Sequence, residues 1–459
     1  MHKIEISQII GLPVEEMAKL RELIATFDNH SAKNDIKDRY YEGKIPLSEV
    51  NLGIALPDGL MKLEIGCAWG GKTVDVLAGR SMFDGFVGIN GETVDEIDKI
   101  AADNNLVNEY NKACRDELKF GCVFATLSDS DEGAKIRFHS PQTAAAIWDG
   151  EKNRIAYGFA IIDTAPDNDH NWTPSRLNYY TDTAIWVIYK ENGFWKAEEH
   201  PHKMGRPMME ALIWNATSNK PFGRSRIKEP VRRLIQGYVR TVANASIGLE
   251  FATSPQKYLL GVTDEQFEAV VNDKFRQYVG SMLTATTNPE TGEKPSFGQL
   301  LQGTITPHVD MLRILSTQFS AATGLTVTDT GVVNDANPTS SDAILAQSQT
   351  LIQTAQQLNT NNSKGLKNIA LMALAITLDV PLDELTEEQK AIVAHFKNPA
   401  MPSVAVTADA AVKIASVRQG FADTDVFLEM LGFDKADIRR IKSQEGRSRG
   451  MALVAEIEG

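Results

Sequence analysis

The chain has 459 residues, enough for about three domains of ordinary size. Apolar residues make up 42% and charged residues 23%, which excludes collagen-like, low-complexity and wholly disordered chains. The 47 basic and 60 acidic side chains give a net charge of −13, which disfavours a surface that binds nucleic acid non-specifically. Three cysteines without a CxxC spacing disfavour a disulfide framework and a cysteine-based zinc site.

Neither an export signal nor a membrane span is predicted. Residues 1–5 carry no apolar run of the kind that opens a signal peptide. The most apolar stretch, residues 369–378, is much shorter than the roughly 20 residues that a membrane-spanning helix needs. The sequence therefore predicts a soluble protein made in a reducing compartment.

The first half of the chain changes its apolar period once. Helical spacing predicts that residues 1–125 are mainly helical, with one helix starting near Pro13 and another over 92–120. From Phe120 to about Trp214 the period becomes two, and turn residues separate short runs, which predicts an antiparallel β region. The strands expected there are 122–125, 135–138, 155–159 and 184–189.

Helical patterns return after the β region, so we expect an α+β, helix-rich fold. Helices over 229–248 and 307–323 are about sixty residues apart, and they can pair as an antiparallel hairpin with a small module at its tip. Asn337 and Pro338 form an N-cap and first-turn pair for a long helix. Its segment 343–363 has no charged residue, so we expect protein to cover it on most sides.

Residues 66–73, Gly-Cys-Ala-Trp-Gly-Gly-Lys-Thr, match the G-x-x-x-x-G-K-[ST] pattern of a phosphate-binding loop. In such a loop Lys72 would pair with phosphate and Thr73 would hold magnesium, with Asp163 as the acid that binds the metal from the end of an apolar strand. A working loop follows a buried parallel strand, whereas residues 61–65 alternate in polarity and no second parallel strand follows. We interpret the match as a chance one in a strand-to-helix turn and keep a P-loop NTPase as the alternative function.

The histidines give little support for catalysis. His200 and His202, beside Glu198 and Glu199, form the one cluster with metal-like chemistry, and an exposed polar loop explains them better. His308 begins a helix without a carboxylate or cysteine beside it. The nucleophile-elbow, zinc-protease and dinucleotide-binding motifs are absent. We therefore expect no enzymatic activity, no catalytic residue, no metal and no cofactor.

A basic segment stands out in this acidic chain at residues 223–233. Arg226, Arg233 and Arg240 are seven apart, so they share one helical face if the helix starts early enough to include Arg226. Two interpretations stay open: a solvated face or ion pairs between subunits, and a ring of positive charge that faces phosphate. The candidate phosphate contacts are Arg224, Arg226, Lys228, Arg232, Arg233 and Arg240.

The order of these motifs resembles the portal proteins of tailed bacteriophages. Residues 39–44, Arg-Tyr-Tyr-Glu-Gly-Lys, look like an early YYxG element, and residues 69–86 resemble the family's W…VD.L..R….GF element. Residues 223–225, 251–261 and 337–344 are similar to its GrS turn, its fa.PqR..lG element and its anP.SaeAi element. Together these elements extend over most of the first three quarters of the chain.

The resemblance implies a portal fold with a mixed α/β wing, an antiparallel two-helix stem, a small α/β clip and a helical crown. The implied parts are a wing at 1–225, stem helices at 226–248 and 307–324, a clip at 249–306, a tunnel loop at 325–336, a long wing helix with further helices at 337–400, and crown or tail helices at 401–459. Thr326 and Val327 stand where the family usually has a proline, which affects the limits of the tunnel loop.

The tunnel loop is expected to project into a channel as its narrowest gate. It contains two acids and no base, whereas a loop that grips phosphate needs Lys or Arg, so we expect a steric, weakly repulsive collar. Gly331 supplies the freedom to bend. The expected loop residues are Val327, Thr328, Asp329, Thr330, Gly331, Val332, Asn334 and Asp335.

The resemblance also implies a ring, usually of twelve subunits, at one vertex of the virion capsid. Such a ring is assembled in the host cytoplasm, carries double-stranded DNA in packaging and ejection without sequence-specific binding, and docks the terminase large subunit and a head–tail adaptor. Major capsid and scaffolding proteins are further implied partners. A closed head-to-tail ring needs heterologous faces, and an acidic channel keeps DNA sliding. Another structural virion or adaptor protein remains a second alternative.

Overall fold

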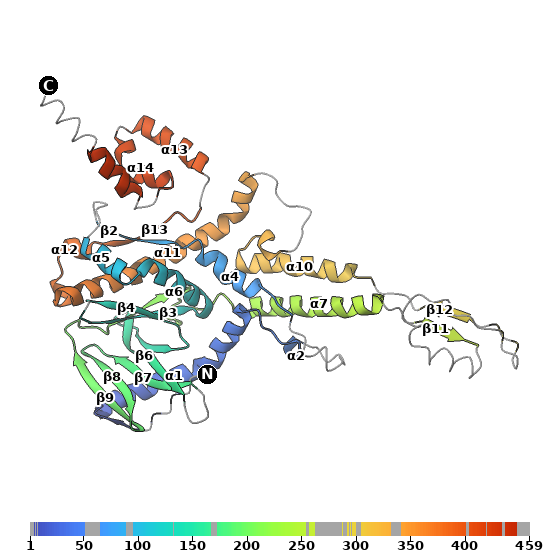
Figure 1. Cartoon of the computed structure of the whole chain (residues 1–459), viewed down its shortest axis with the longest axis horizontal. Helices are drawn as coiled ribbons and strands as arrows, with labels where there is room; N and C mark the ends of the chain where they lie inside the picture. Colours follow the sequence, from blue (N-terminus) through green and yellow to red (C-terminus); the bar gives the residue numbers. More distant parts are fainter. Residues whose placement is uncertain are drawn as a thin grey trace. The chain divides into compact units, whose positions relative to one another are not determined.

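The computed structural model describes residues 4, 6, 8–50, 65–88, 95–131, 133–166, 172–253, 257–261, 287, 292, 294, 296–299, 304–331, 341–400, 404–418, 420–433 and 437–447. The chain divides into two compact units, Met1–Lys397 and Asn398–Gly459. The first unit combines long helices with β-sheets, as Figure 1 shows, so the expected α+β, helix-rich class is confirmed.

The N-terminal part of the first unit is helical. It contains α1 (Val14–Tyr41), α2 (Leu47–Val50), α4 (Trp69–Ala78), α5 (Asp95–Asp103) and α6 (Leu106–Phe120). The prediction of one helix over 92–120 is wrong, because the chain breaks between α5 and α6. Asn105 has a φ of 48°, and the Asn104 side chain donates 2.9 Å to the Ala134 carbonyl and accepts from the Ile136 amide. Asparagine tolerates the left-handed region, so this pair ends one helix and starts the next.

The predicted antiparallel β region is confirmed, and it forms two sheets. One has the order β10–β3–β4, from Met209–Ile213, Cys122–Ser128 and Lys135–His139. The other has the order β1–β9–β8–β7–β6–β5, from Ile9–Ile10, Phe194–Pro201, Ala184–Glu191, Trp172–Tyr180, Arg154–Pro166 and Ala144–Asp149. Its neighbours are antiparallel, except that β1 runs parallel to β9. The sheets meet closely at Gly158, where a Cβ atom would lie 2.5 Å from the Met209 sulfur.

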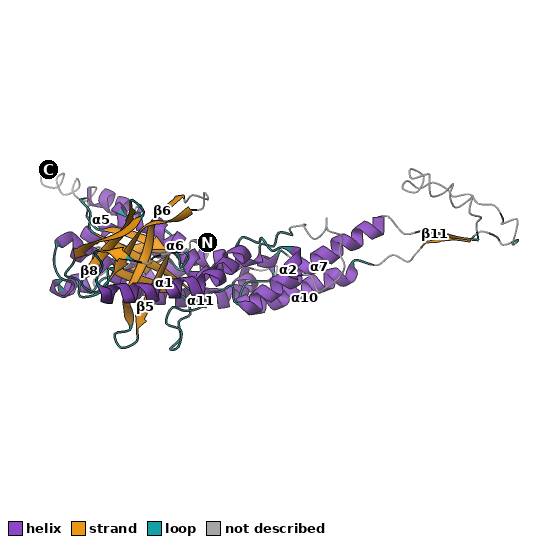
Figure 2. Ribbon diagram, turned by 90° about the horizontal axis from the view of Figure 1, so that it is seen from below, coloured by secondary structure: helices purple, strands orange, loops and turns teal. Residues whose placement is uncertain are grey.

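Two helices that are far apart in sequence run side by side. They are α7 (Glu229–Thr253) and α10 (Thr306–Thr323), which Figures 1 and 2 both show as an antiparallel pair. Gly237 of α7 lets Leu315 of α10 approach so closely that an added Cβ would lie 3.1 Å from it. Beyond the pair, β11 (Lys257–Leu260) and β12 (Ser296–Gln299) form an antiparallel ladder. The predicted helical hairpin is confirmed, although α7 extends past residue 248.

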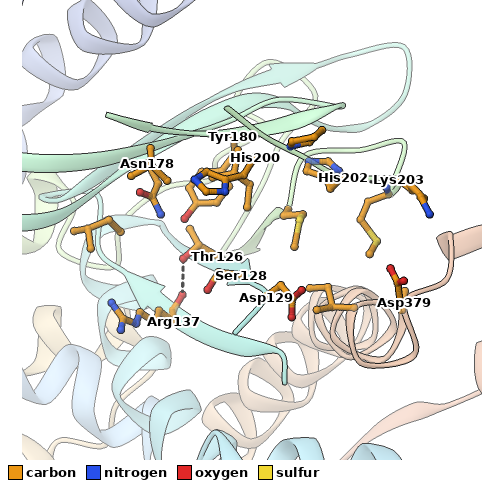
Figure 3. A pocket seen from close by; sticks show the side chains of 18 of the residues that line it. Thr126, Ser128, Asp129, Arg137, Asn178, Tyr180, His200, His202, Lys203 and Asp379 are labelled. Atoms are coloured by element: carbon orange, nitrogen blue, oxygen red, sulfur yellow. Dashed lines mark hydrogen bonds between the residues drawn. The ribbon is translucent and has the colours of Figure 1, made fainter. Parts of the chain in front are cut away.

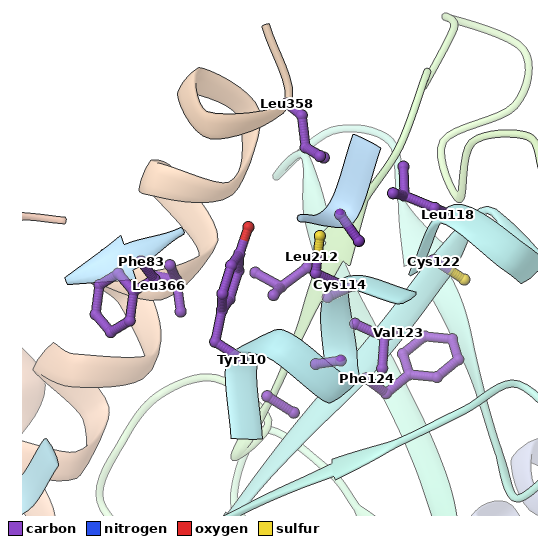
Figure 4. Packing of buried hydrophobic residues seen from close by; sticks show 14 of the residues in the cluster. Phe83, Tyr110, Cys114, Leu118, Cys122, Val123, Phe124, Leu212, Leu358 and Leu366 are labelled. Carbon is purple, nitrogen blue, oxygen red and sulfur yellow. The ribbon is translucent and has the colours of Figure 1, made fainter. Parts of the chain in front are cut away.

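The long helix α11 (Ser341–Leu378) covers the three-stranded sheet. Figure 4 shows this packing, in which α6, β3 and β10 meet the apolar face of α11. Asn337 and Pro338, the expected start of this helix, lie outside the described residues. After α11 come η2 (Leu382–Glu384), α12 (Glu387–Lys390) and β13 (Val393–Phe396), which pairs with β2 (Phe83–Val87).

The second unit is helical in its described part. It contains α13 (Val404–Val417), η3 (Phe421–Asp423), α14 (Asp425–Met430) and a helical stretch over 437–447. Lys442 of the 437–447 stretch forms an ion pair with Asp425 of α14, and the Phe421 ring of η3 packs edge-on against Phe427 of α14. These contacts stabilise the packing of the short helices. In the described parts of both units, no helix combines the length and apolar character needed to cross a membrane.

Candidate functional site

The basic segment passes into α7 through a turn in which Arg226 is buried. Only 9% of this residue is exposed. Its Nε donates 2.7 Å to the Thr73 carbonyl, and its Nη2 donates 2.6 Å to the Thr323 carbonyl at the end of α10. Burial lowers the pKa of Arg226 to about 10, so the side chain keeps its charge at neutral pH. A cation at a helix C-terminus satisfies free carbonyls and the helix dipole, so Arg226 ties α10 to α4.

This geometry corrects the expectation that Arg226 contacts DNA. Two of its guanidinium nitrogens donate to carbonyls inside the chain and the residue is buried, so it is not presented to phosphate. The seven-residue spacing of Arg226, Arg233 and Arg240 also fails to define one face, because α7 begins at Glu229 and Arg226 precedes it. Arg233 lies on the exposed surface and pairs with Glu229 at 2.6 Å one turn earlier. The spacing argument assumed a helix that the turn at residues 226–227 interrupts.

The remaining basic candidates stay at the surface. Arg224 and Lys228 are exposed, whereas Arg232 and Arg240 are half-buried. The Arg232 guanidinium lies 5.9 Å from the ring centre of Tyr40, a cation–π contact with the end of α1. These side chains, with Arg233, are therefore the ones available for ion pairs between subunits or for phosphate.

Trp69, the first residue of α4, joins three separate parts of the chain. Its ring lies between Tyr238 of α7 and Phe319 of α10, with ring centroids 4.7 and 4.6 Å away. The residue is only 3% exposed, and its Nε1 donates 3.0 Å to the carbonyl of Thr330. One side chain thus fixes both paired helices and the segment that follows them. We call Trp69, Tyr238, Phe319, Thr330 and Arg226 the helix-pair junction.

The start of the expected tunnel loop is packed onto this junction. Residues 328–330 form the 3-10 turn η1, and the Thr330 hydroxyl lies 2.6 Å from that of Ser316 on α10. Asp329 Oδ2 accepts from the amide and the hydroxyl of Thr326, at 2.9 and 2.8 Å. Gly331 follows with a φ of 73°. The expectation of a loop that projects from residue 325 is therefore wrong for its first part, because Val327, Thr328, Asp329, Thr330 and Gly331 belong to a turn that is anchored on α10. The other expected loop residues, Val332, Asn334 and Asp335, lie outside the described residues.

The residues that mimic a phosphate-binding loop are mostly helical. Because α4 begins at Trp69, only two residues separate Gly66 from the helix, too few to wrap a phosphate. Gly70 is required by packing, since a Cβ atom there would lie 1.9 Å from the Tyr40 carbonyl oxygen of α1. The Thr73 hydroxyl donates back to the Trp69 carbonyl at 2.8 Å. The Gly-rich residues thus serve the contact between α4 and α1, and the second half of the expected strand-to-helix turn is the first turn of α4.

Lys72→Ala should leave the protein nearly unchanged. Lys72 is exposed, so we expect its loss to change the free energy of unfolding by less than about 0.5 kcal/mol. Gly70→Ala, two residues away, should destabilise strongly because of the Tyr40 carbonyl. Thermal unfolding checks both variants. Nucleotide binding that Lys72→Ala abolishes would contradict the assignment.

A polar cavity of about 460 Å³ lies between the six-stranded sheet, β3 and the C-terminal end of α11. Figure 3 shows that His200 and His202 belong to its wall, with Asn178 and Tyr180 beside them. His200 is part of β9, so the expectation of a loop there is wrong. Burial lowers the pKa of His202, which keeps its ring neutral. Among the described residues, no cluster of three or more His, Cys, Asp or Glu side chains is arranged to hold a metal.

The family is decided by a model that matches nearly the whole chain. A model described as phage portal protein, SPP1 Gp6-like, matches residues 21–450. The chain belongs to this portal family. Portal proteins of this family are structural proteins of the virion, not enzymes, so the P-loop NTPase alternative is wrong.

Solved structures with similarity to this portal chain come from gene transfer agent (GTA) particles. The virion of a native GTA particle matches with 13% identity and a TM-score of 0.46, covering 80% of this chain and 89% of that one. The neck of an empty particle, computed with C6 symmetry, matches with 12% identity and a TM-score of 0.47, covering 82% and 95%. The neck of a native particle, computed with C12 symmetry, matches with 12% identity and a TM-score of 0.45, covering 80% of this chain and 89% of that one. A comparison with curated proteins found no match.

Proposed function

We propose that this portal protein forms a closed ring at one capsid vertex, through which double-stranded DNA enters during packaging and leaves during ejection. The observation that carries the proposal is the helix pair α7–α10, which is anchored by Trp69 and Arg226 and leads into the β11–β12 ladder. In a portal ring this pair is the stem, and the ladder belongs to the clip. The terminase large subunit, a head–tail adaptor, and the major capsid and scaffolding proteins are the proposed partners around the ring.

Exposed apolar side chains on α10 support assembly with a neighbouring subunit. Met311 and Ile314, which are three positions apart and so lie on one side of α10, are 39% and 52% exposed, whereas Leu315 and Phe319 of the same helix are buried. Large apolar side chains at adjacent helical positions are typical of surfaces that another chain covers. A closed ring, which twelve copies would form, supplies that neighbour.

The outer side of α11 is a second proposed subunit contact. Gln349, Gln353, Gln356 and Thr360 lie exposed at helical spacing, whereas Leu351, Ala355 and Leu358 on the other side are buried. Neutral amides cost less to remove from water than charged groups, and they can form hydrogen bonds across an interface. This face therefore suits a partner of the same polar, uncharged kind.

The charge of the chain suits passage of DNA more than binding. A net charge of −13 on each subunit repels phosphate along a channel and prevents tight non-specific association. Arg224, Lys228, Arg232 and Arg240 are the proposed positive contacts near the stem, with Arg233 held by Glu229. The segment that follows Gly331 is the proposed gate.

Ile314→Glu tests the assembly on which the function depends. A carboxylate placed at this apolar position would have to be buried at every subunit contact, so we expect rings to be lost while the monomer stays folded. Particles made with this variant should contain no DNA. Mass photometry, circular dichroism and particle counting measure the three outcomes.

The matched control is Val417→Glu, which places the same charge at an 87% exposed apolar position of α13. It should assemble and package as the unaltered chain does. Normal rings from Ile314→Glu would mean that α10 does not face a neighbour, and intact rings without packaging would separate assembly from the channel role.

A further inference from the structure

Among the described residues, Glu210 and Glu117 are buried glutamates that each accept a hydrogen bond from a side-chain amide of α11, and Glu210 is paired with a cation. Glu210 of β10 accepts 2.8 Å from Asn368 and pairs at 2.6 Å with the buried Arg206. Glu117 of α6 accepts 2.6 Å from Asn362 and is completely buried. Within the described part of the chain, Glu117 forms no salt bridge. An ionised carboxylate without a cation is costly in such a place, so the two glutamates need different protonation states.

Two oxygen atoms of this second pair have no hydrogen-bond partner among the described residues. They are Oε1 of Glu117 and Oδ1 of Asn362, and both are buried. While Glu117 is ionised both atoms are acceptors, so neither can satisfy the other. A single proton on the Glu117 carboxyl changes this, because an O–H group can donate to the amide oxygen while the carboxyl oxygen accepts from Nδ2.

Neighbouring hydrogen bonds fix the orientation of the Asn362 amide. Its Nδ2 also donates 3.1 Å to the Tyr110 hydroxyl, which uses the second N–H. Ser81 donates 2.6 Å to Asn359 Oδ1, so the hydrogen bond of 2.7 Å between Ser81 and Tyr110 has the tyrosine as donor. In this series of hydrogen bonds each group donates to the next, from Asn362 through Tyr110 and Ser81 to Asn359. The Asn362 amide therefore keeps its nitrogen at Tyr110 and Glu117, and its oxygen needs a donor from elsewhere.

We propose that Glu117 carries a proton in the folded chain and pairs with the Asn362 amide through two hydrogen bonds, as a proton-dependent clamp between α6 and α11. Loss of the proton would leave a buried negative charge and two acceptor oxygens without a donor. The clamp lies near the middle of the helix that follows the proposed tunnel loop, and Figure 4 shows Tyr110 and Cys114 of α6 facing that helix. Raising the pH should therefore loosen the hold of α6 on α11.

The surroundings of the clamp agree with this assignment. Burial raises the pKa of Glu117 to about 8, and it also raises the pKa of Tyr110 and Cys114 on α6 and that of Cys122 on β3, which keeps these groups neutral. Charged groups on the elements packed around the clamp have partners of their own: Lys37 of α1 binds Asn34 and the Phe120 carbonyl, Asp75 of α4 pairs with Arg115, Glu210 of β10 with Arg206, and Asp84 of β2 with His395. Arg137 of β4 and Lys364 of α11 are exposed, and Lys367 of α11 is half-buried.

Glu117→Gln tests the clamp, because glutamine makes both hydrogen bonds without a titrating proton. The folded chain holds this proton and the unfolded chain releases it between the ordinary pKa of 4.5 and the raised value of about 8. Stability of the unaltered chain should thus fall with rising pH relative to the variant. We expect the ratio of their unfolding constants to change by up to about tenfold per pH unit between pH 5 and 8 and then level off.

Glu210→Gln is the matched control, since it removes an ionised partner of Arg206. It should destabilise the chain without a steep pH dependence over the same range. Infrared spectra of the full chain give a second readout: a protonated-carboxyl band at pH 7 that Glu117→Gln removes and Glu210→Gln keeps. A flat stability ratio, or the lack of a band assigned to Glu117, would overturn the proposal.

Discussion

Replacing Trp69 with alanine should destabilise this portal chain by about 3–5 kcal/mol, the usual cost of removing a buried tryptophan. The residue is 3% exposed and packs against Tyr238 and Phe319, so its loss leaves a cavity between α4, α7 and α10. Denaturant unfolding of the full chain measures the effect. Trp172→Ala, at a 61% exposed position, is the control and should change stability by less than about 0.5 kcal/mol.

A second substitution separates ring packing from the hydrogen bond. Trp69→Phe keeps an aromatic ring between the helices and removes the donor to the Thr330 carbonyl. It should cost about 1–2 kcal/mol and expose the segment after α10 to proteolysis. Equal stability of Trp69→Ala and the unaltered chain would contradict the junction.

Arg226→Met should destabilise the chain by about 2–4 kcal/mol, because it leaves the carbonyls of Thr73 and Thr323 without their donors in a buried place. Methionine keeps most of the side-chain volume, so the loss measures the guanidinium contacts. Arg224→Met, at an exposed position two residues earlier, should have little effect on stability. Thermal unfolding of both variants distinguishes the positions.

The same pair of variants tests the role that the spacing of arginines suggested. If Arg226→Met kept full stability and formed rings that stalled in DNA packaging, the residue would be a phosphate contact. We expect the opposite result: Arg226→Met lowers the stability of the chain, and any defect in DNA packaging follows from that loss.

Local patterns were enough to predict most of the fold. The change of period at Phe120 located the β region, and two apolar stripes located the helix pair. The break at Asn104–Asn105 was missed, although two adjacent asparagines favour a turn and the buried faces of α5 and α6 are out of helical phase with each other. The parallel strand β1 has only two residues and depends on β9 for its pairing.

The candidate site was harder to predict, since its contacts join distant residues. Arg226 bonds carbonyls 153 and 97 residues away, and Trp69 bonds one 261 residues away. The missed signal was the tryptophan beside Gly70 and Gly71: an aromatic residue next to small ones at a helix start indicates close packing as well as it indicates a phosphate loop. The spacing of the arginines gave a wrong prediction for Arg226, because it assumed that the helix includes this residue, whereas α7 begins three residues later.

The mass of the purified full-length protein tests the central claim, ring formation, most directly. Mass photometry at micromolar concentration should show a main species of twelve copies of the 50.5 kDa chain, about 606 kDa, with a central hole in negative-stain images of the same sample. A sample that contains only monomers of 50.5 kDa at every salt concentration would contradict the account.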